Sequence, residues 1–125
     1  MSFHRSTETE LWTNPSPSTD FAAQTITLSE DMTNYTYLKF YCKALKTGTK
    51  TFSIIIPVED FVASTTGSTL TDDFRFCLTN GGAPKRTFQY KSNTQITFSG
   101  ASYISCPNTY TMNQTAYPLV IYGVN

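Results

Sequence analysis

The feature that most constrains the fold is a stretch from Tyr35 to Leu45 in which apolar and polar side chains alternate. The set expected to face a core is Thr36, Leu38, Phe40, Cys42 and Ala44. The set expected to face outwards is Tyr35, Tyr37, Lys39, Tyr41 and Lys43. Successive side chains of a strand point to opposite faces, so this period of two predicts a β-strand with one buried face.

Similar short segments recur along the chain between turn signals. We expect strands over residues 8–13, 23–29, 35–45, 51–58, 73–78, 86–90, 95–99, 103–106 and 119–122. The glycine-bearing turn at 46–50 predicts a hairpin, residues 59–64 suggest a brief helix, and 29–34 suggest one helical turn. Eight or nine short strands at this spacing predict an all-β fold, an antiparallel β-sandwich of jelly-roll-like form.

A chain of 125 residues is expected to form one domain. We expect residues 1–7 to be a flexible N-terminal arm and 8–125 a single β-sandwich domain. The N-terminus has no apolar core of a secretory signal. The runs of aliphatic residues, such as Ile54–Ile56, are only three residues long, so no membrane insertion is expected.

Charge is balanced, with nine basic and nine acidic residues, and only 14% of residues are charged. Nucleic-acid binding needs clustered Lys and Arg, and anionic membranes attract the same clusters, so neither partner is expected. The nearest basic group is Lys85 with Arg86, followed by Lys91, and we expect these side chains to be solvated around a turn.

The three cysteines, Cys42, Cys77 and Cys106, are widely spaced and form no CxxC pair. They are interpreted as reduced, buried side chains within apolar stretches. With neither a zinc pattern nor a nucleotide-binding glycine motif, no metal and no cofactor are expected.

Catalytic parts are sparse, so we expect no enzyme and assign no catalytic residue. The one histidine, His4, falls in the expected arm, where nothing would hold it as a base. The adjacent acidic pairs are Glu30–Asp31, Glu59–Asp60 and Asp72–Asp73. Neighbouring side chains of an extended chain diverge, so no single pair supplies the two convergent carboxylates of a glycosidase.

Exposed aromatic side chains are the strongest indication of binding. Tyr35, Tyr37 and Tyr41 share one face of one strand, and aromatic rings stack on sugar faces at little entropy cost. The alternative, which we favour, is that a second sheet or a neighbouring subunit covers them. Trp12 is the fourth candidate, although a core or interface anchor fits it better than a sugar platform.

The two ends of the chain carry a resemblance. Leu11-Trp12-Thr13-Asn14, then Phe21 to Thr25 with Leu28, together with the closing Pro118-Leu119-Val120-Ile121-Tyr122-Gly123, resemble tail-associated structural proteins of bacteriophages that infect Gram-positive bacteria. Tyr35 and Leu38 fit the strand that follows the first segment in those proteins. The likeness covers about a third of the chain and brings no defined set of binding residues.

The resemblance implies a non-enzymatic virion protein, assembled in the host bacterial cytoplasm and often trimeric. Its partners would be other virion proteins and a host cell-surface saccharide, so its role would be host adsorption or tail assembly. The alternative function is a stand-alone carbohydrate-binding module.

Overall fold

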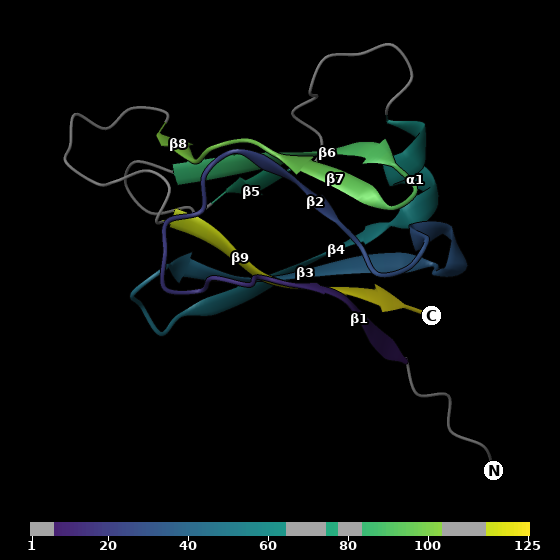
Figure 1. The fold of residues 1–125 in the computed structure, drawn as a ribbon, viewed down its shortest axis with the longest axis horizontal. Helices are drawn as coiled ribbons and strands as arrows, with labels where there is room; N and C mark the ends of the chain where they lie inside the picture. The colour runs from purple at the N-terminus through teal and green to yellow at the C-terminus, as the bar shows by residue number, and fades with distance from the viewer. Residues whose placement is uncertain (1–6, 65–74, 78–83, 104–114) are drawn as a thin grey trace.

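The computed structural model describes residues 7–64, 75–77, 84–103 and 115–125, and they form two antiparallel sheets stacked as a sandwich (Figure 1). The first sheet has the order β1 (Glu8–Thr13), β9 (Thr115–Val124), β3 (Tyr37–Leu45), β4 (Thr51–Pro57). The second has the order β2 (Gln24–Thr27), β7 (Gln95–Phe98), β6 (Pro84–Ser92), β5 (Arg75–Cys77), with β8 (Ser102–Tyr103) paired to β6. The predicted all-β sandwich is confirmed.

Two short helical elements lie at one end of the sandwich. The 3-10 turn η1 (Met32–Asn34) precedes β3, and the helix α1 (Val58–Ala63) follows β4, as the sequence predicted for both positions. Figure 1 shows α1 at the end of the layers, where the chain leaves the first sheet. The two elements contact each other, so they close this end of the sandwich together.

The two end segments of the chain pair with each other. Strand β1 runs antiparallel to β9, with Glu8 opposite Val124 and Thr13 opposite Val120. Strand β9 also pairs with β3, so the last strand lies between the first and the third. The second strand likewise lies beside the late strand β7, and this wrapping of the chain's end around its beginning is typical of jelly rolls. Consecutive strands also pair within each sheet, β3 with β4 in the first and β6 with both β5 and β7 in the second.

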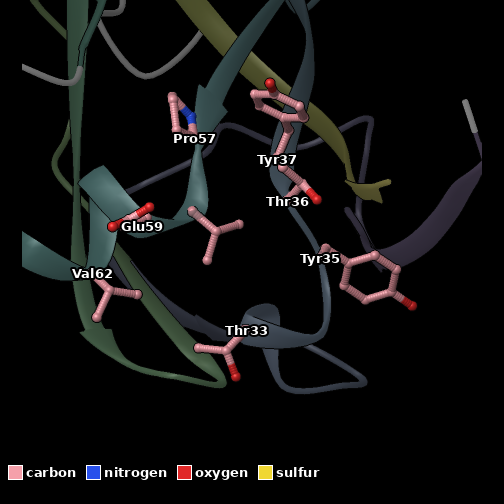
Figure 2. A pocket seen from close by; sticks show the side chains of 8 residues that line it. Thr33, Tyr35, Thr36, Tyr37, Pro57, Glu59 and Val62 are labelled. Carbon is pink, nitrogen blue, oxygen red and sulfur yellow. The ribbon is translucent and has the colours of Figure 1, made fainter.

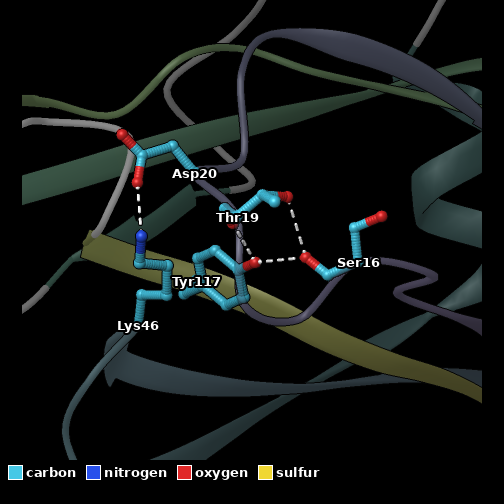
Figure 3. Close-up of polar contacts among 5 residues, drawn as sticks. All are labelled: Ser16, Thr19, Asp20, Lys46 and Tyr117. Carbon is cyan, nitrogen blue, oxygen red and sulfur yellow. Dashed lines mark hydrogen bonds and ion pairs between the residues drawn. The ribbon is translucent and has the colours of Figure 1, made fainter.

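The connection between β1 and β2 is held by side chains from distant strands (Figure 3). The Tyr117 hydroxyl donates to the carbonyl oxygens of Ser16 and Thr19, the former at 3.0 Å. The Lys46 ammonium lies 2.7 Å from the Asp20 carboxylate. A segment whose prolines cannot donate backbone hydrogen bonds is therefore fixed to β9 and to the β3–β4 turn.

The core lies between the sheets and is rich in aromatic rings. Leu38, Phe40 and Cys42 are fully buried, as predicted, whereas Thr36 is exposed and Ala44 is half-buried. The prediction for Thr36 was wrong because β3 begins at Tyr37, so Thr36 lies before the covered part of the sheet. The principal buried side chains beyond β3 are Leu11, Phe21, Ile26, Leu28, Met32, Ile56, Val58, Phe61, Phe88, Ile96, Phe98, Tyr117 and Ile121.

Arg86 corrects a second expectation, because its side chain is fully buried and not solvated. Its guanidinium donates to the carbonyl oxygens of Ala116, Phe21 and Ser99, at 2.9, 2.8 and 2.9 Å. It also stacks over the Phe21 ring, 5.0 Å from the centroid. Burial lowers the pKa of Arg86 to about 10, so the group is still charged at neutral pH. Local sequence could not reveal this, because the three carbonyls come from three distant segments.

Several other expectations concern single residues. Cys42 is a buried free thiol, and burial raises its pKa well above the usual range. Residues 1–6 with His4, the pair Asp72–Asp73, the Cys77 side chain and Cys106 lie outside what the structure describes. Thr7, assigned to the arm, accepts a hydrogen bond at its carbonyl from the Asn125 amide at 3.2 Å. Among the described residues, no helix has the length and apolarity needed to cross a membrane.

Candidate binding site

A surface hollow of about 550 Å³ opens at the end of the sandwich that carries η1 and α1. We call it the α1 hollow. Its lining comes from two banks (Figure 2): the β3 bank, which runs from η1 to the start of β3, and the β4 bank, at the junction of β4 with α1. The lining residues are Thr33, Tyr35, Thr36, Tyr37, Pro57, Val58, Glu59 and Val62.

The β3 bank is fixed by hydrogen bonds around η1. Asp31 caps the turn, since its carboxylate accepts the Thr33 amide at 2.8 Å and also the Thr33 hydroxyl. These two bonds hold the pKa of Asp31 below its ordinary value. The Met32 amide donates to the Asn93 carbonyl at 2.8 Å, which ties η1 to the turn between β6 and β7. The position of Thr33 is therefore tied to the turn between β6 and β7 of the second sheet.

Tyr35 is held against the closing segment of the chain. A Cβ placed on Gly123 would lie 2.5 Å from the Tyr35 ring, so the ring lies on bare glycine backbone. The Tyr35 hydroxyl donates to Glu30 at 2.9 Å. In Figure 2 the ring points away from the hollow, so Tyr35 supports the bank more than it presents a free ring.

The opposite bank is joined to the first by the strand register. Tyr37 pairs with Pro57, and the Val58 amide donates to the Thr36 carbonyl at 3.0 Å. Pro57 ends β4 and begins the turn into α1, because proline is compatible with a helix start but not with a continued ladder. The side chain of Phe61 is buried and anchors the helix. Glu59 and Val62 of the same helix line the hollow.

The lining combines the elements that bind a polar, ring-shaped ligand. Tyr37 is 41% exposed and pairs with Pro57 across the strands, and the apolar side chains of Pro57, Val58 and Val62 also line the hollow. The Thr33 and Thr36 hydroxyls can donate and accept hydrogen bonds, and the exposed Glu59 carboxylate can accept them. An apolar floor with a few polar groups is the usual composition of a small-ligand site. Among the described lining residues Glu59 is the sole carboxylate, whereas glycoside hydrolysis uses two.

The four aromatic residues selected from the sequence are not gathered into one site. Tyr35 and Tyr37 line the α1 hollow. Tyr41 lies farther along β3 on the outer face, opposite Ser53 and Val120 and half-buried. Trp12 packs on the edge of Phe21, with ring centroids 6.0 Å apart, and contacts the core through Phe98.

Sequence reasoning did not assign the β4 bank to the site. The signal was present, because a β3–β4 hairpin turning at 46–50 places Pro57 opposite Tyr37. A brief helix was also predicted directly after this point. Pairing the two predictions would have placed Glu59 and Val62 beside Tyr37.

In the parts of the chain that the structure describes, no group of three or more His, Cys, Asp or Glu side chains is placed to hold a metal ion. Compared with protein-family models and with curated proteins, the chain matches none.

Proposed function

We propose that this chain is a non-enzymatic, tail-associated protein of a bacteriophage particle that assists host adsorption by binding a cell-surface saccharide in the α1 hollow. The observation that carries the proposal is a hollow whose lining combines the exposed Tyr37 ring with the Thr33 and Thr36 hydroxyls and the Glu59 carboxylate. A sugar ring presents C–H groups to an aromatic face and hydroxyls to its surroundings, so this lining complements it.

The virion setting is supported by the resemblance of the end segments. In the sandwich Leu11 to Thr13 lie in β1, Gln24 and Thr25 lie in β2, and the closing segment lies in β9, whose residues 120–124 pair with β1. Gly123, the last residue of the closing segment, lies under the Tyr35 ring and so connects this segment to the hollow.

Weak binding by one copy is compatible with adsorption because a virion displays many copies. Linked sites raise the effective concentration of each further contact, so avidity exceeds the affinity of one hollow. Self-association of the chain into a homo-oligomer would supply the first level of such repetition. A structural role in joining tail parts is the second candidate, and the exposed apolar side chains of Tyr37, Leu45 and Ile55 favour it.

The test is a comparison of Tyr37→Ala with Tyr41→Ala on an array of bacterial wall saccharides. Both remove a tyrosine ring from the same face of β3, but only Tyr37 lines the hollow. Loss of one stacking ring weakens binding about tenfold, so Tyr37→Ala is expected to bind at least that much more weakly than the parent. Tyr41→Ala is expected to bind as the parent does.

Equal losses in the two variants, or none in either, would remove the α1 hollow from the proposal. Failure of the parent protein to bind any wall saccharide would favour the tail-joining role. Binding of similar strength by an isolated single chain that never joins a particle would favour the stand-alone carbohydrate-binding module.

A further inference from the structure

Strand β4 forms an edge of the first sheet and carries no charged residue from Thr51 to Pro57. Edge strands of soluble proteins are commonly protected by charges, bulges or proline, since an open edge pairs with other strands. The opposite edge, β1, follows this rule with Glu8, Glu10 and a register shift before Trp12. Among the described strands of this sheet, β4 is therefore the edge strand with neither a charge nor a bulge, and its one proline, Pro57, stands at its last position.

The direction of the free backbone groups of β4 follows from its bonds to β3. The Ala44 amide donates to the Lys50 carbonyl, and the Val58 amide donates to the Thr36 carbonyl. Hydrogen-bonded pairs alternate along an antiparallel ladder, so the even-numbered residues of β4 bond to β3. The odd-numbered residues Thr51, Ser53 and Ile55 therefore direct their N–H and C=O groups away from the sheet. Pro57, the next in this series, has no N–H and limits the free edge.

The side chains along this edge are apolar on the inner face, whereas the outer face combines the hydroxyls of Thr51 and Ser53 with apolar Ile55 and Pro57. Ile55 is 59% exposed on the outer face. On the inner face Phe52 and Ile54 are half-buried and pack against the core from its margin. A further strand beside β4 would cover all three side chains.

Opposite charges flank the two ends of the strand. Lys50 immediately precedes β4, whereas Glu59 and Asp60 follow it in the first turn of α1. None of the three forms an ion pair among the described residues. If a second β4 paired antiparallel with the first, Lys50 of each copy would lie near Glu59 and Asp60 of the other copy.

We propose that the β4 edge is the interface for a second copy of this chain, which pairs β4 with β4 antiparallel about a two-fold axis. Pairing Ser53 with Ile55 of the other copy satisfies the outward backbone groups. The same register sets Ile54 beside its own counterpart and Phe52 beside Ile56. Like residues meet across the axis, as in any isologous interface. This arrangement is a dimer, in contrast to the trimer that the resemblance implies.

The interface lies next to the proposed ligand site, because Pro57 and Glu59 also line the α1 hollow. In the chosen register Thr51 of the second copy is opposite Pro57, so the Lys50 end reaches the rim of the hollow. Pairing is measured without any ligand, so its failure is distinguishable from failure of saccharide binding.

The test is the mass of the purified full chain by sedimentation equilibrium at micromolar concentration. We expect a dimer for the parent, and at least about tenfold weaker self-association for Ile55→Lys, which places a charge on the open edge. Thr25→Lys is the matched control, because Thr25 is an exposed β-branched residue on β2, the edge of the other sheet. It is expected to dimerise as the parent does.

Two further variants keep the proposal open to contradiction if Ile55→Lys fails to fold. Lys50→Glu and Glu59→Lys are each expected to weaken the dimer roughly fivefold, and the double exchange is expected to restore it. A monomeric or trimeric parent would overturn the proposal. So would an Ile55→Lys protein that folds and dimerises like the parent, or a double exchange that restores nothing.

Discussion

Replacing Arg86 with methionine is expected to lower the free energy of unfolding by about 3 kcal/mol, roughly 1 kcal/mol for each carbonyl acceptor left unpaired. The guanidinium is fully buried and satisfies the carbonyl oxygens of Phe21, Ser99 and Ala116. Methionine fills similar space but donates no hydrogen bond, so these acceptors would be left unpaired in the interior. Urea denaturation followed by circular dichroism measures the change.

Lys91→Met is the matched control, since Lys91 is an exposed basic residue on the same strand. Its effect is expected to stay within about 0.5 kcal/mol, as for ordinary surface substitutions. An equally small effect for Arg86→Met would contradict the structural role given to Arg86. In that role its side chain joins β6 to Phe21, before β2, and to Ala116, at the start of β9.

Replacing Gly123 with alanine is expected to cost about 2 kcal/mol of stability and to weaken binding at the α1 hollow. The new methyl group would lie 2.5 Å from the Tyr35 ring, so either the ring or β9 must move. Because Tyr35 lines the hollow, its displacement would alter the β3 bank. Thermal unfolding and saccharide binding measure the two effects separately.

Gly48→Ala is the control for this change, because its added Cβ would meet the nearest atom, in Leu45, at 3.4 Å. That is an ordinary contact, so little loss is expected. Combining Gly123→Ala with Tyr35→Ala tests the cause directly, since removal of the ring removes the clash. The double variant should therefore lose less stability than the sum of the single changes. Strictly additive losses would show that the ring contact is not what requires glycine.

The β3 segment shows how far alternation alone can reach. Leu38, Phe40 and Cys42 were predicted to face the core because side chains of a strand alternate between its two faces. Burial of the apolar face then fixes the register of the strand. The hairpin to β4 followed from the turn at 46–50. These predictions are local, so the sequence pattern was sufficient for them.

The pairing of β1 with β9 and the burial of Arg86 are of a different kind. Both depend on contacts between segments that are far apart in the sequence. Strands β1 and β9 are about a hundred residues apart, and Arg86 is several tens of residues from Phe21. A basic residue beside a turn signal is usually solvated, and no local pattern marks the exception. The α1 hollow is intermediate, because the elements of its two banks follow from local predictions, whereas the hydrogen bond from the Met32 amide to the Asn93 carbonyl ties η1 to a distant turn.

Nuclear magnetic resonance of the ¹⁵N-labelled chain, titrated with fragments of a Gram-positive cell-wall polysaccharide, tests the central claim most directly. If the α1 hollow is the contact site, the amide signals of Thr33, Thr36, Tyr37, Glu59 and Val62 should shift together with added saccharide. Those of Gln89 and Thr97, in the second sheet, should not move. Shifts confined to the second sheet, or cleavage of the saccharide into new reducing ends during the titration, would contradict the account.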